Sequence, residues 1–352
     1  MTPSGVPWER VKEVFHGALL LPAEDREAFL AGSGEAEAEV RSLLEAHEQA
    51  SGFLDDPAVN LRPVLENYAG RRIGHYLLER QLGEGGMGAV YLANREMDGY
   101  AMPVAVKLIR AGAFSESVAR RFRNERQILA RLHHANITQL LDGGVTPERM
   151  PYLVMEYVAG QPLDGYLRSR PVGLSERLRL FLEICGAVGE AHRNLIVHGD
   201  LKPSNVLVTV EGQVKLLDFG ISRLLGEETE QATLQAMTPA WASPEQLRGE
   251  APLISTDCYA LGRLLYFLLT GTPAVNPAGR TSHDLLEWLK GSTPVRPSRA
   301  AVDPELVGDL DNIALKALEF SPEDRYRTVE LLADDVRAHL GSRPISARTH
   351  TW

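Results

Sequence analysis

The chain has 352 residues, of which 44% are apolar and 24% charged, as is typical of a soluble globular protein with a substantial core. Its net charge is −10, and it lacks the clustered Lys and Arg that power binding to a nucleic-acid backbone. Cys185 and Cys258 are too few for a disulfide framework and have no metal-ligand spacing. We expect both to be core thiols in a reducing compartment.

The charge is unevenly distributed. Residues 1–68 hold 13 acidic and 5 basic side chains, and residues 69–352 hold 34 and 32. The near-neutral larger part suits an enzyme whose substrate is another protein. The N-terminus shows no apolar signal segment, and the sequence contains no run of about 18 apolar residues that would span a membrane. We therefore expect a cytoplasmic protein segment, and a membrane-anchored parent protein stays open.

Residues 1–68 are predicted to form a small helical N-terminal extension. Trp8, Val11 and Phe15 recur at helical spacing, and residues 35–50 predict a further helix. Two interpretations stay open: an accessory cap on the main domain, or a docking or regulatory module.

From residue 73 the pattern changes to short β-rich runs separated by glycine-containing turns, and after about residue 160 it becomes mostly helical. Strands followed by helices predict an α+β fold with two lobes. The boundaries we predict are 73–340 for the main domain, with an N-lobe at about 73–157, a C-lobe at about 158–340, and a polar tail at 341–352.

Three glycines, Gly83, Gly85 and Gly88, form a G-x-G-x-x-G pattern between two predicted strands. Glycines let backbone N–H groups approach phosphate oxygens. A dinucleotide-binding fingerprint would need a helix next, whereas Ala89 to Leu92 predict a strand. Lys107 ends an apolar strand 19 residues later. Alone it would be a surface lysine; after a glycine hairpin it suits a cation that holds ATP phosphates.

The run His198-Gly199-Asp200-Leu201-Lys202-Pro203-Ser204-Asn205 is followed by Leu217-Asp218-Phe219-Gly220. Together with the glycine pattern and the strand lysine, it resembles the eukaryotic-type serine/threonine protein kinase family over residues 76–340. The family patterns are H-R-D-L-K-x-x-N and D-F-G. The alanine-rich N-terminal part and the ending Arg343 to Arg348 resemble bacterial members.

The resemblance implies a two-lobed protein kinase fold and the transfer of the γ-phosphate of ATP to a protein hydroxyl in bacterial signalling. Such transfer needs positioning and charge neutralisation more than covalent chemistry. Asp200 would accept the proton from the attacking hydroxyl or orient it, and Lys202 would neutralise charge on the γ-phosphate. Asn205 and Asp218 would bind Mg²⁺ or Mn²⁺. Autophosphorylation and self-association stay open.

The resemblance also assigns supporting roles. Glu125 would pair with Lys107, and Val154 to Val158 would be the hinge that binds adenine. The nucleotide-binding residues implied in addition to the three glycines are Val90, Ala105, Lys107, Met155, Glu156 and Val158. Without the surrounding motifs, each of these apolar residues would be interpreted as core packing.

Other landmarks imply structural roles. Glu245 and Arg325 resemble the family's ion pair, and Asp257 resembles the buried aspartate that supports the catalytic loop. Thr238 resembles the threonine that contacts that loop.

Two residues depart from the family pattern. Gly199 replaces the arginine of H-R-D, which in relatives pairs with a phosphorylated activation segment (here residues 218–245). Met237 stands where a glycine is usual. Gly199 argues against activation by phosphorylation of Thr229 or Thr233. The departures keep a second interpretation open, a nucleotide-binding pseudokinase. A small-molecule phosphotransferase is disfavoured because residues 238–245 resemble a peptide-docking segment.

Overall fold

The computed structural model describes residues 67–85, 88–97, 100–109, 129–219, 239–276 and 280–347, with Val14, Val40, Phe122, Arg126 and Gln127. The chain divides into two units, Met1–Glu66 and Asn67–Trp352. In the first unit only Val14 and Val40 are described, and both are helical and buried. The rest of the predicted helical extension lies outside the described residues.

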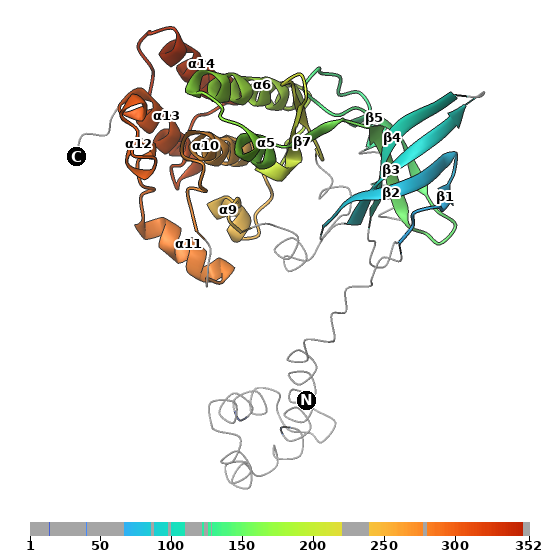
Figure 1. Cartoon of the computed structure of the whole chain (residues 1–352). Coiled ribbons are helices and arrows are strands. Elements are labelled where there is room, and N and C mark those ends of the chain that lie inside the picture. The colour runs from blue at the N-terminus through green and yellow to red at the C-terminus, as the bar shows by residue number, and fades with distance from the viewer. Residues whose placement is uncertain are drawn as a thin grey trace. The chain divides into compact units, whose positions relative to one another are not determined.

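The first part of the second unit is an antiparallel sheet with the strand order β1-β2-β3-β4-β6-β5 (Figure 1). β4 lies between β3 and β6, and Val104, Val106 and Leu108 are fully buried in it, as expected for β-branched and aliphatic residues in a central strand. The strands are β1 Arg72–Ile73, β2 Tyr76–Gly85, β3 Gly88–Met97, β4 Tyr100–Ile109, β5 Leu140–Val145 and β6 Pro151–Glu156.

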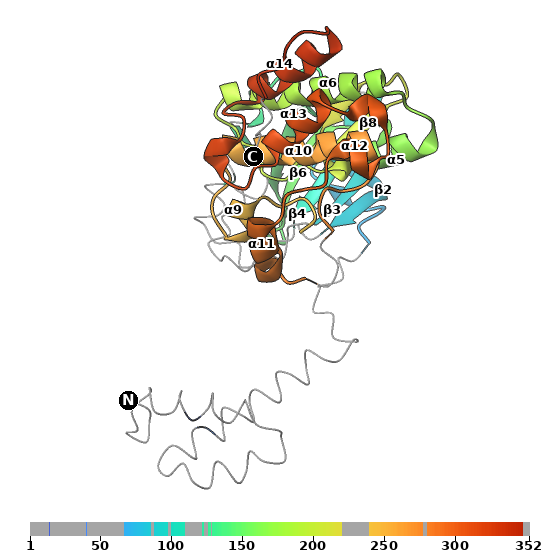
Figure 2. The ribbon, with the colours of Figure 1, turned by 90° about the vertical axis from the view of Figure 1, so that its left-hand side faces the viewer.

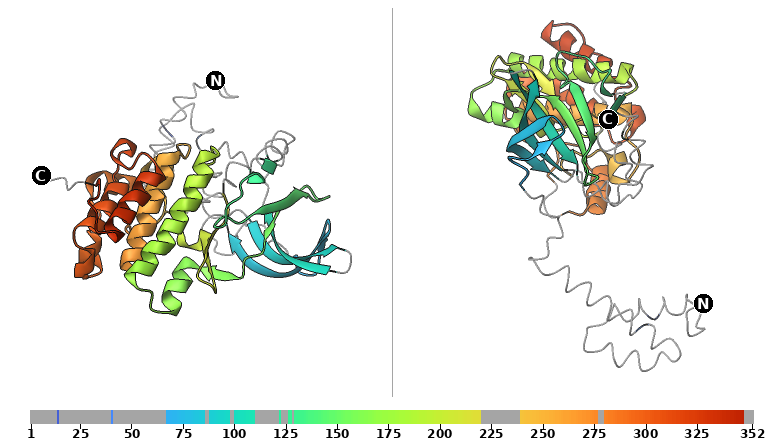
Figure 3. Two further views of the ribbon diagram at one scale, coloured as in Figure 1. Left: turned by 90° about the horizontal axis from the view of Figure 1, so that it is seen from above. Right: turned by 90° about the vertical axis from the view of Figure 1, so that its right-hand side faces the viewer.

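The second part is mostly helical. A small sheet of β7 Gly160–Pro162, β8 Val206–Thr209 and β9 Val214–Leu216 accompanies the helices. The helices are α5 Leu163–Ser169, α6 Leu174–Arg193, α9 Pro244–Leu247, α10 Ile254–Thr270, α11 Ser282–Gly291, α12 Pro297–Ala300, α13 Asp309–Ala317 and α14 Val329–Leu340. The 3₁₀ turns are η2 Pro203–Asn205, η3 Pro304–Leu306 and η4 Pro322–Asp324. Seen from above, the helices and the larger sheet form two distinct lobes (Figure 3), as the sequence predicted.

Helix α10 lies at the centre of the helical lobe. Its residues are buried nearly all round, as expected for a helix that is apolar on every face, and α6 and α13 pack against it. Cys185 on α6 and Cys258 on α10 are free and buried; burial, and then the charge of Asp257, raises the pKa of Cys258 to about 12. The prediction of core thiols is confirmed.

The edge of the helical lobe carries α11, which packs against α9 (Figure 2). No helix within the described residues is long and apolar enough to cross a membrane.

The segment after α14 packs back on the helical lobe as far as Ala347. The carboxylate of Asp335 accepts hydrogen bonds from the backbone N–H groups of Ser346 (2.6 Å) and Ala347 (2.9 Å) and from the Tyr326 hydroxyl (2.7 Å). The Ala347 side chain is buried. Within the region we had expected to be a polar tail, residues 345–347 therefore belong to the packed domain.

Candidate active site

The glycine hairpin joins β2 to β3, with Gly83 opposite Val90 and Gly85 opposite Gly88. Gly88 has φ +147°, and a Cβ there would lie 1.9 Å from the carbonyl oxygen of Leu108, so the fold itself requires glycine. Gly83 and Gly85 are exposed, and added Cβ atoms would meet nothing within 4 Å. Their lack of side chains therefore serves no packing need and would let a ligand approach the hairpin closely.

Strand register places the predicted adenine-binding residues on three neighbouring strands. Val90 on β3 pairs with Lys107 on β4, and Ala105 on β4 pairs with Met155 on β6. Ala105 and Met155 are nearly buried. Val158 follows β6, and within the described residues it makes no hydrogen bond, which leaves its backbone available to an adenine edge.

Glu156 differs from its neighbours in having an engaged side chain. Its carboxylate accepts hydrogen bonds from Lys215 Nζ (2.6 Å) and the Gln139 backbone N–H (3.3 Å). Only the backbone of Glu156 could therefore serve a nucleotide.

Lys107 and Asp218 meet across 111 residues of sequence. The Lys107 ammonium lies 2.7 Å from Asp218 Oδ2, and the lysine is only 7% exposed. A buried cation of this kind needs a charged partner, and Asp218 provides one. The predicted partner of Lys107, Glu125, lies outside the described residues.

The catalytic loop holds Asp200 from two sides. Lys202 Nζ lies 3.1 Å from Asp200 Oδ1 and 2.8 Å from Oδ2, while Asn205 Nδ2 donates to Oδ2 at 3.0 Å. The side chain of Asp200 is 31% exposed. A carboxylate fixed in this way and open to solvent can receive a proton from a hydroxyl placed against it.

The Asn205 amide is oriented by its contacts. Its Nδ2 donates to both the carbonyl and the carboxylate of Asp200, which leaves Oδ1 as the side-chain atom able to bind a cation. The Asn205 carbonyl accepts the Leu217 N–H at 2.9 Å, one residue before Asp218. Oxygen donors of this kind fit Mg²⁺. Among the described residues, no cluster of three or more His, Cys, Asp or Glu side chains could hold a metal.

His198 links the catalytic loop to the Asp218 segment. Its Nε2 donates to the Leu217 carbonyl (2.9 Å), which leaves Nδ1 to accept the Asp200 N–H (3.3 Å). The centre of its ring lies 4.6 Å from the centre of the Phe219 ring. Through these two hydrogen bonds the His198 ring connects the backbones of the segments that carry Asp200 and Asp218.

Asp257, near the start of α10, supports the catalytic loop through hydrogen bonds. Its fully buried carboxylate accepts hydrogen bonds from the backbone N–H groups of His198 (2.8 Å) and Gly199 (2.9 Å) and from His192 Nε2 (2.8 Å). Three donors satisfy a charge that would otherwise be costly to bury. The predicted supporting role of Asp257 is confirmed.

The sequence matches the protein kinase domain family over residues 76–336. The chain belongs to the protein kinase family. PknB of Mycobacterium tuberculosis is 37% identical over 285 residues, which cover 78% of this kinase and 45% of that protein. Pkn1 of Myxococcus xanthus is 34% identical and covers 89% of this kinase and 45% of Pkn1. Both come from bacteria and are named serine/threonine-protein kinases, which confirms the predicted resemblance to bacterial members of that family.

A solved structure has the same fold. The kinase domain of Mycobacterium tuberculosis PknI is 26% identical, with a TM-score of 0.61 over 78% of this kinase and 98% of that chain. The kinase spans less than half the length of its curated relatives. The Pkn1 match covers more than residues 67–352 alone, which are 286 of 352, so it reaches into the first unit.

The predicted ion pair of the kinase is present. Arg325 binds Glu245 through both carboxylate oxygens, at 2.8 and 3.0 Å. Thr256 Oγ1 also donates to Glu245, and the guanidinium lies 4.6 Å from the ring centre of Tyr259. The pair fixes the end of the activation segment to the helical lobe.

Several sequence predictions on this kinase fall outside the described residues: Glu125, Thr229, Thr233, Met237 and Thr238.

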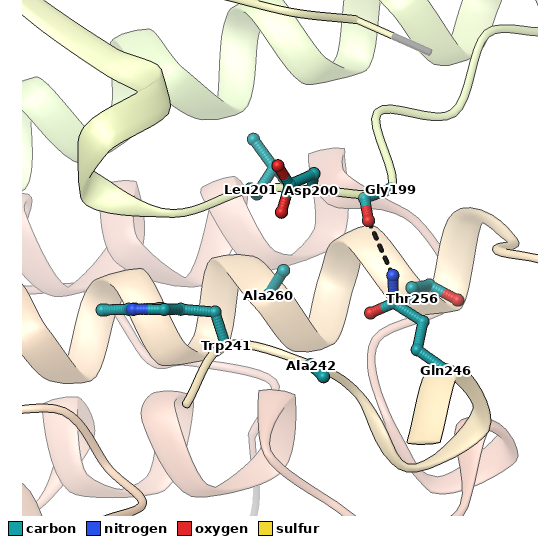
Figure 4. Close-up of a pocket in the computed structure, with 8 residues that line it drawn as sticks. All are labelled: Gly199, Asp200, Leu201, Trp241, Ala242, Gln246, Thr256 and Ala260. Atoms are coloured by element: carbon teal, nitrogen blue, oxygen red, sulfur yellow. Dashed lines mark hydrogen bonds between the residues drawn. The ribbon is translucent and has the colours of Figure 1, made fainter. Parts of the chain in front are cut away.

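Gln246 is a residue that the motif analysis missed. Its side-chain amide donates to the Gly199 carbonyl at 2.6 Å, next to Asp200 (Figure 4). The pattern Ser243-x-x-Gln246 is a sequence signal for a helix capping box, and that box is present in α9. Nothing in the pattern indicated that the same amide also reaches the catalytic loop.

Proposed function

We propose that the kinase transfers the γ-phosphate of ATP to serine or threonine hydroxyls of protein substrates in a Mg²⁺-dependent reaction. The family generally uses ATP and Mg²⁺ and acts on proteins. The proposal includes autophosphorylation, a cytoplasmic location where ATP is available, and a role in bacterial signalling.

One observation carries the proposal: the carboxylate of Asp200 is held jointly by Lys202 and Asn205. Asp200 would orient the hydroxyl and accept its proton, and Lys202, already beside it, would neutralise the γ-phosphate as charge moves onto it. Lys107 would hold the other phosphates, and the oxygens of Asn205 and Asp218 would hold the cation that bridges them.

The test is ATP-dependent phosphorylation of a generic protein substrate, with mass spectrometry to locate phosphate on the substrate and on the kinase. Asp200→Asn and Asp218→Asn should each reduce transfer at least a hundredfold and leave the fold intact. Asp334→Asn on α14 is the matched control. Among the described residues its exposed carboxylate pairs with Arg337 alone, one turn away, so this variant should retain the wild-type rate.

The outcomes separate the candidate functions. If both active-site variants transfer phosphate at the wild-type rate, the assignment of the site is wrong. If the wild-type protein binds ATP but never transfers phosphate, the pseudokinase interpretation, which Gly199 favours, replaces the enzyme.

A further inference from the structure

Both polar atoms of the Gly199 backbone are bound by side chains from outside the catalytic loop. Its N–H donates to Asp257 Oδ1 at 2.9 Å, and its carbonyl accepts from Gln246 Nε2 at 2.6 Å. The first contact comes from α10 and the second from α9, at the end of the activation segment. Gly199 immediately precedes Asp200, so these contacts control where the Asp200 side chain begins.

The geometry leaves one assignment for the Gln246 amide. Oε1 accepts the backbone N–H of Ser243 at 3.0 Å, and Nε2 faces a carbonyl, so the nitrogen must donate to Gly199. In return the Gln246 N–H donates to Ser243 Oγ at 3.3 Å. Gln246 is 8% exposed. The helix cap therefore fixes Oε1 of this side chain, and Nε2 reaches the catalytic loop.

The cavity beside this contact is small. The cavity lined by Gly199, Asp200, Trp241, Gln246 and neighbouring residues measures about 10 Å³ (Figure 4), which is at the lower limit for one water molecule. Gly199 itself has φ +74°, and a Cβ there would lie 3.2 Å from Pro252 Cγ. Gly199 therefore allows a left-handed backbone conformation but has no side chain that could bind a neighbouring segment. The side chain of Gln246 makes that contact instead.

We infer that Gln246 is a positioning residue that couples the end of the activation segment to Asp200 through the Gly199 carbonyl, independently of phosphorylation. The inference rests on the proposed function and adds its regulation. An arginine at position 199 could hold the segment only when a phosphate is present. A neutral amide donating to a carbonyl needs no modification.

Gln246→Glu is the sharpest perturbation because it separates the two ends of the amide. A carboxylate can still accept the Ser243 N–H, but it cannot donate to the Gly199 carbonyl and instead repels it. Leaving a buried carbonyl without a donor lowers the population of the loop geometry seen here by a factor of about five to a hundred. Protonating the new carboxyl restores a donor, and burial raises its pKa. The loss should therefore shrink as pH falls.

The experiment compares phosphatase-treated wild-type, Gln246→Glu, Gln246→Met and Ser243→Ala proteins between pH 5.5 and 8.5. We expect full wild-type activity after phosphatase treatment. At pH 8 Gln246→Glu should lose at least tenfold in kcat with KM for ATP within twofold, and its ratio to wild type should recover as pH falls. Gln246→Met, which keeps the volume and removes the donor, should be impaired without recovery. Ser243→Ala, which keeps the Gln246–Gly199 bond, should stay within threefold.

Hydrogen exchange of residues 196–206 provides a readout independent of turnover, and we expect faster exchange in Gln246→Glu at pH 8. Unchanged kcat and exchange in both Gln246 variants would overturn the inference, as would a wild-type rate that vanishes after phosphatase treatment. If loop exchange responds as expected while the wild type never transfers phosphate, the coupling stands and the proposed function fails.

Discussion

Replacing Arg325 with methionine should be among the most destabilising single changes in the helical lobe. All five guanidinium N–H groups are used: two bind the Glu245 carboxylate at 2.8 and 3.0 Å, and three bind the carbonyl groups of Ser255, Glu319 and Phe320 at 2.8 to 3.0 Å. Methionine keeps much of the volume but leaves a buried carboxylate without its cation. Breaking a buried pair from one side costs about 3–5 kcal/mol, which corresponds to a fall in Tm of roughly 10 °C for a domain of this size.

The direction in which the stability loss of Arg325→Met changes with pH follows from the pKa of Glu245. Burial raises the pKa of Glu245, but hydrogen bonds and the charge of Arg325 outweigh it, so the pKa lies below its ordinary value of 4.5. In the wild type the stabilisation from Glu245 is therefore present above pH 4.5 and lost as pH falls through the folded-state pKa. In Arg325→Met both contributions of Arg325 are lost, and burial is opposed by the backbone and Thr256 hydrogen bonds that remain, so the pKa of Glu245 rises relative to the wild type. The difference in stability between the two proteins should therefore shrink as the solution is acidified.

The assay is urea unfolding of both proteins between pH 4 and pH 8. Glu245→Gln combined with Arg325→Met should recover part of the loss, because no buried charge is left unpaired. Arg337→Met on α14 is the control, since its pair with Asp334 is half exposed and should matter by under about 1 kcal/mol. A loss below 1 kcal/mol for Arg325→Met, or no recovery in the double variant, would refute the reasoning.

Three further predictions concern the nucleotide site, the activation segment and the N-terminal unit. Gly88→Ala forces a Cβ to within 1.9 Å of the Leu108 carbonyl oxygen, so KM for ATP, measured by steady-state kinetics, should rise at least tenfold. The double variant Thr229→Ala, Thr233→Ala should keep most of the wild-type transfer rate, and a large loss restored by acidic substitutions would contradict this. Deleting residues 1–68 should change Tm, solution mass or turnover, because the short helices predicted there would form a marginal core alone; no change in any of these three measurements would indicate an inert tail.

The residues that could be predicted from the sequence are those whose chemical role also fixes their place in a short motif. A carboxylate that must accept a proton, a lysine beside it and an amide that orients it have few substitutes. For that reason the resemblance to the family could assign Asp200, Lys202 and Asn205 from one short motif, and the structure brings Lys202 and Asn205 within hydrogen-bond distance of Asp200. The pair of Glu245 and Arg325, 80 residues apart, could be predicted only through resemblance to the family.

The remaining features depend on contacts that no local pattern encodes. Lys107 is predicted to pair with Glu125, which lies outside the described residues, so that prediction stays open. The structure adds a contact that no motif indicated: the buried Lys107 ammonium pairs with the carboxylate of Asp218. The packing of residues 345–347 on α14 depends on Asp335, whose four acceptor contacts come from Tyr326 and from the segment itself. The composition predicts a polar tail at 341–352, and the contacts of one buried carboxylate pack residues 345–347 of it on the domain.

Gly199 and Gln246 together explain how the catalytic loop can be held without the arginine of its relatives. An Arg–phosphate contact is strong but conditional, because it exists only after the segment is phosphorylated. Around Thr229 and Thr233 the sequence is acidic, with Glu227, Glu228 and Glu230, and added phosphate would be repelled there. The hydrogen bond from Gln246 to Gly199 is weaker for each contact, but it is always present and is backed by the bond from Gly199 to Asp257. A loop held in this way has no switch at position 199, so control of the kinase must act on a different element.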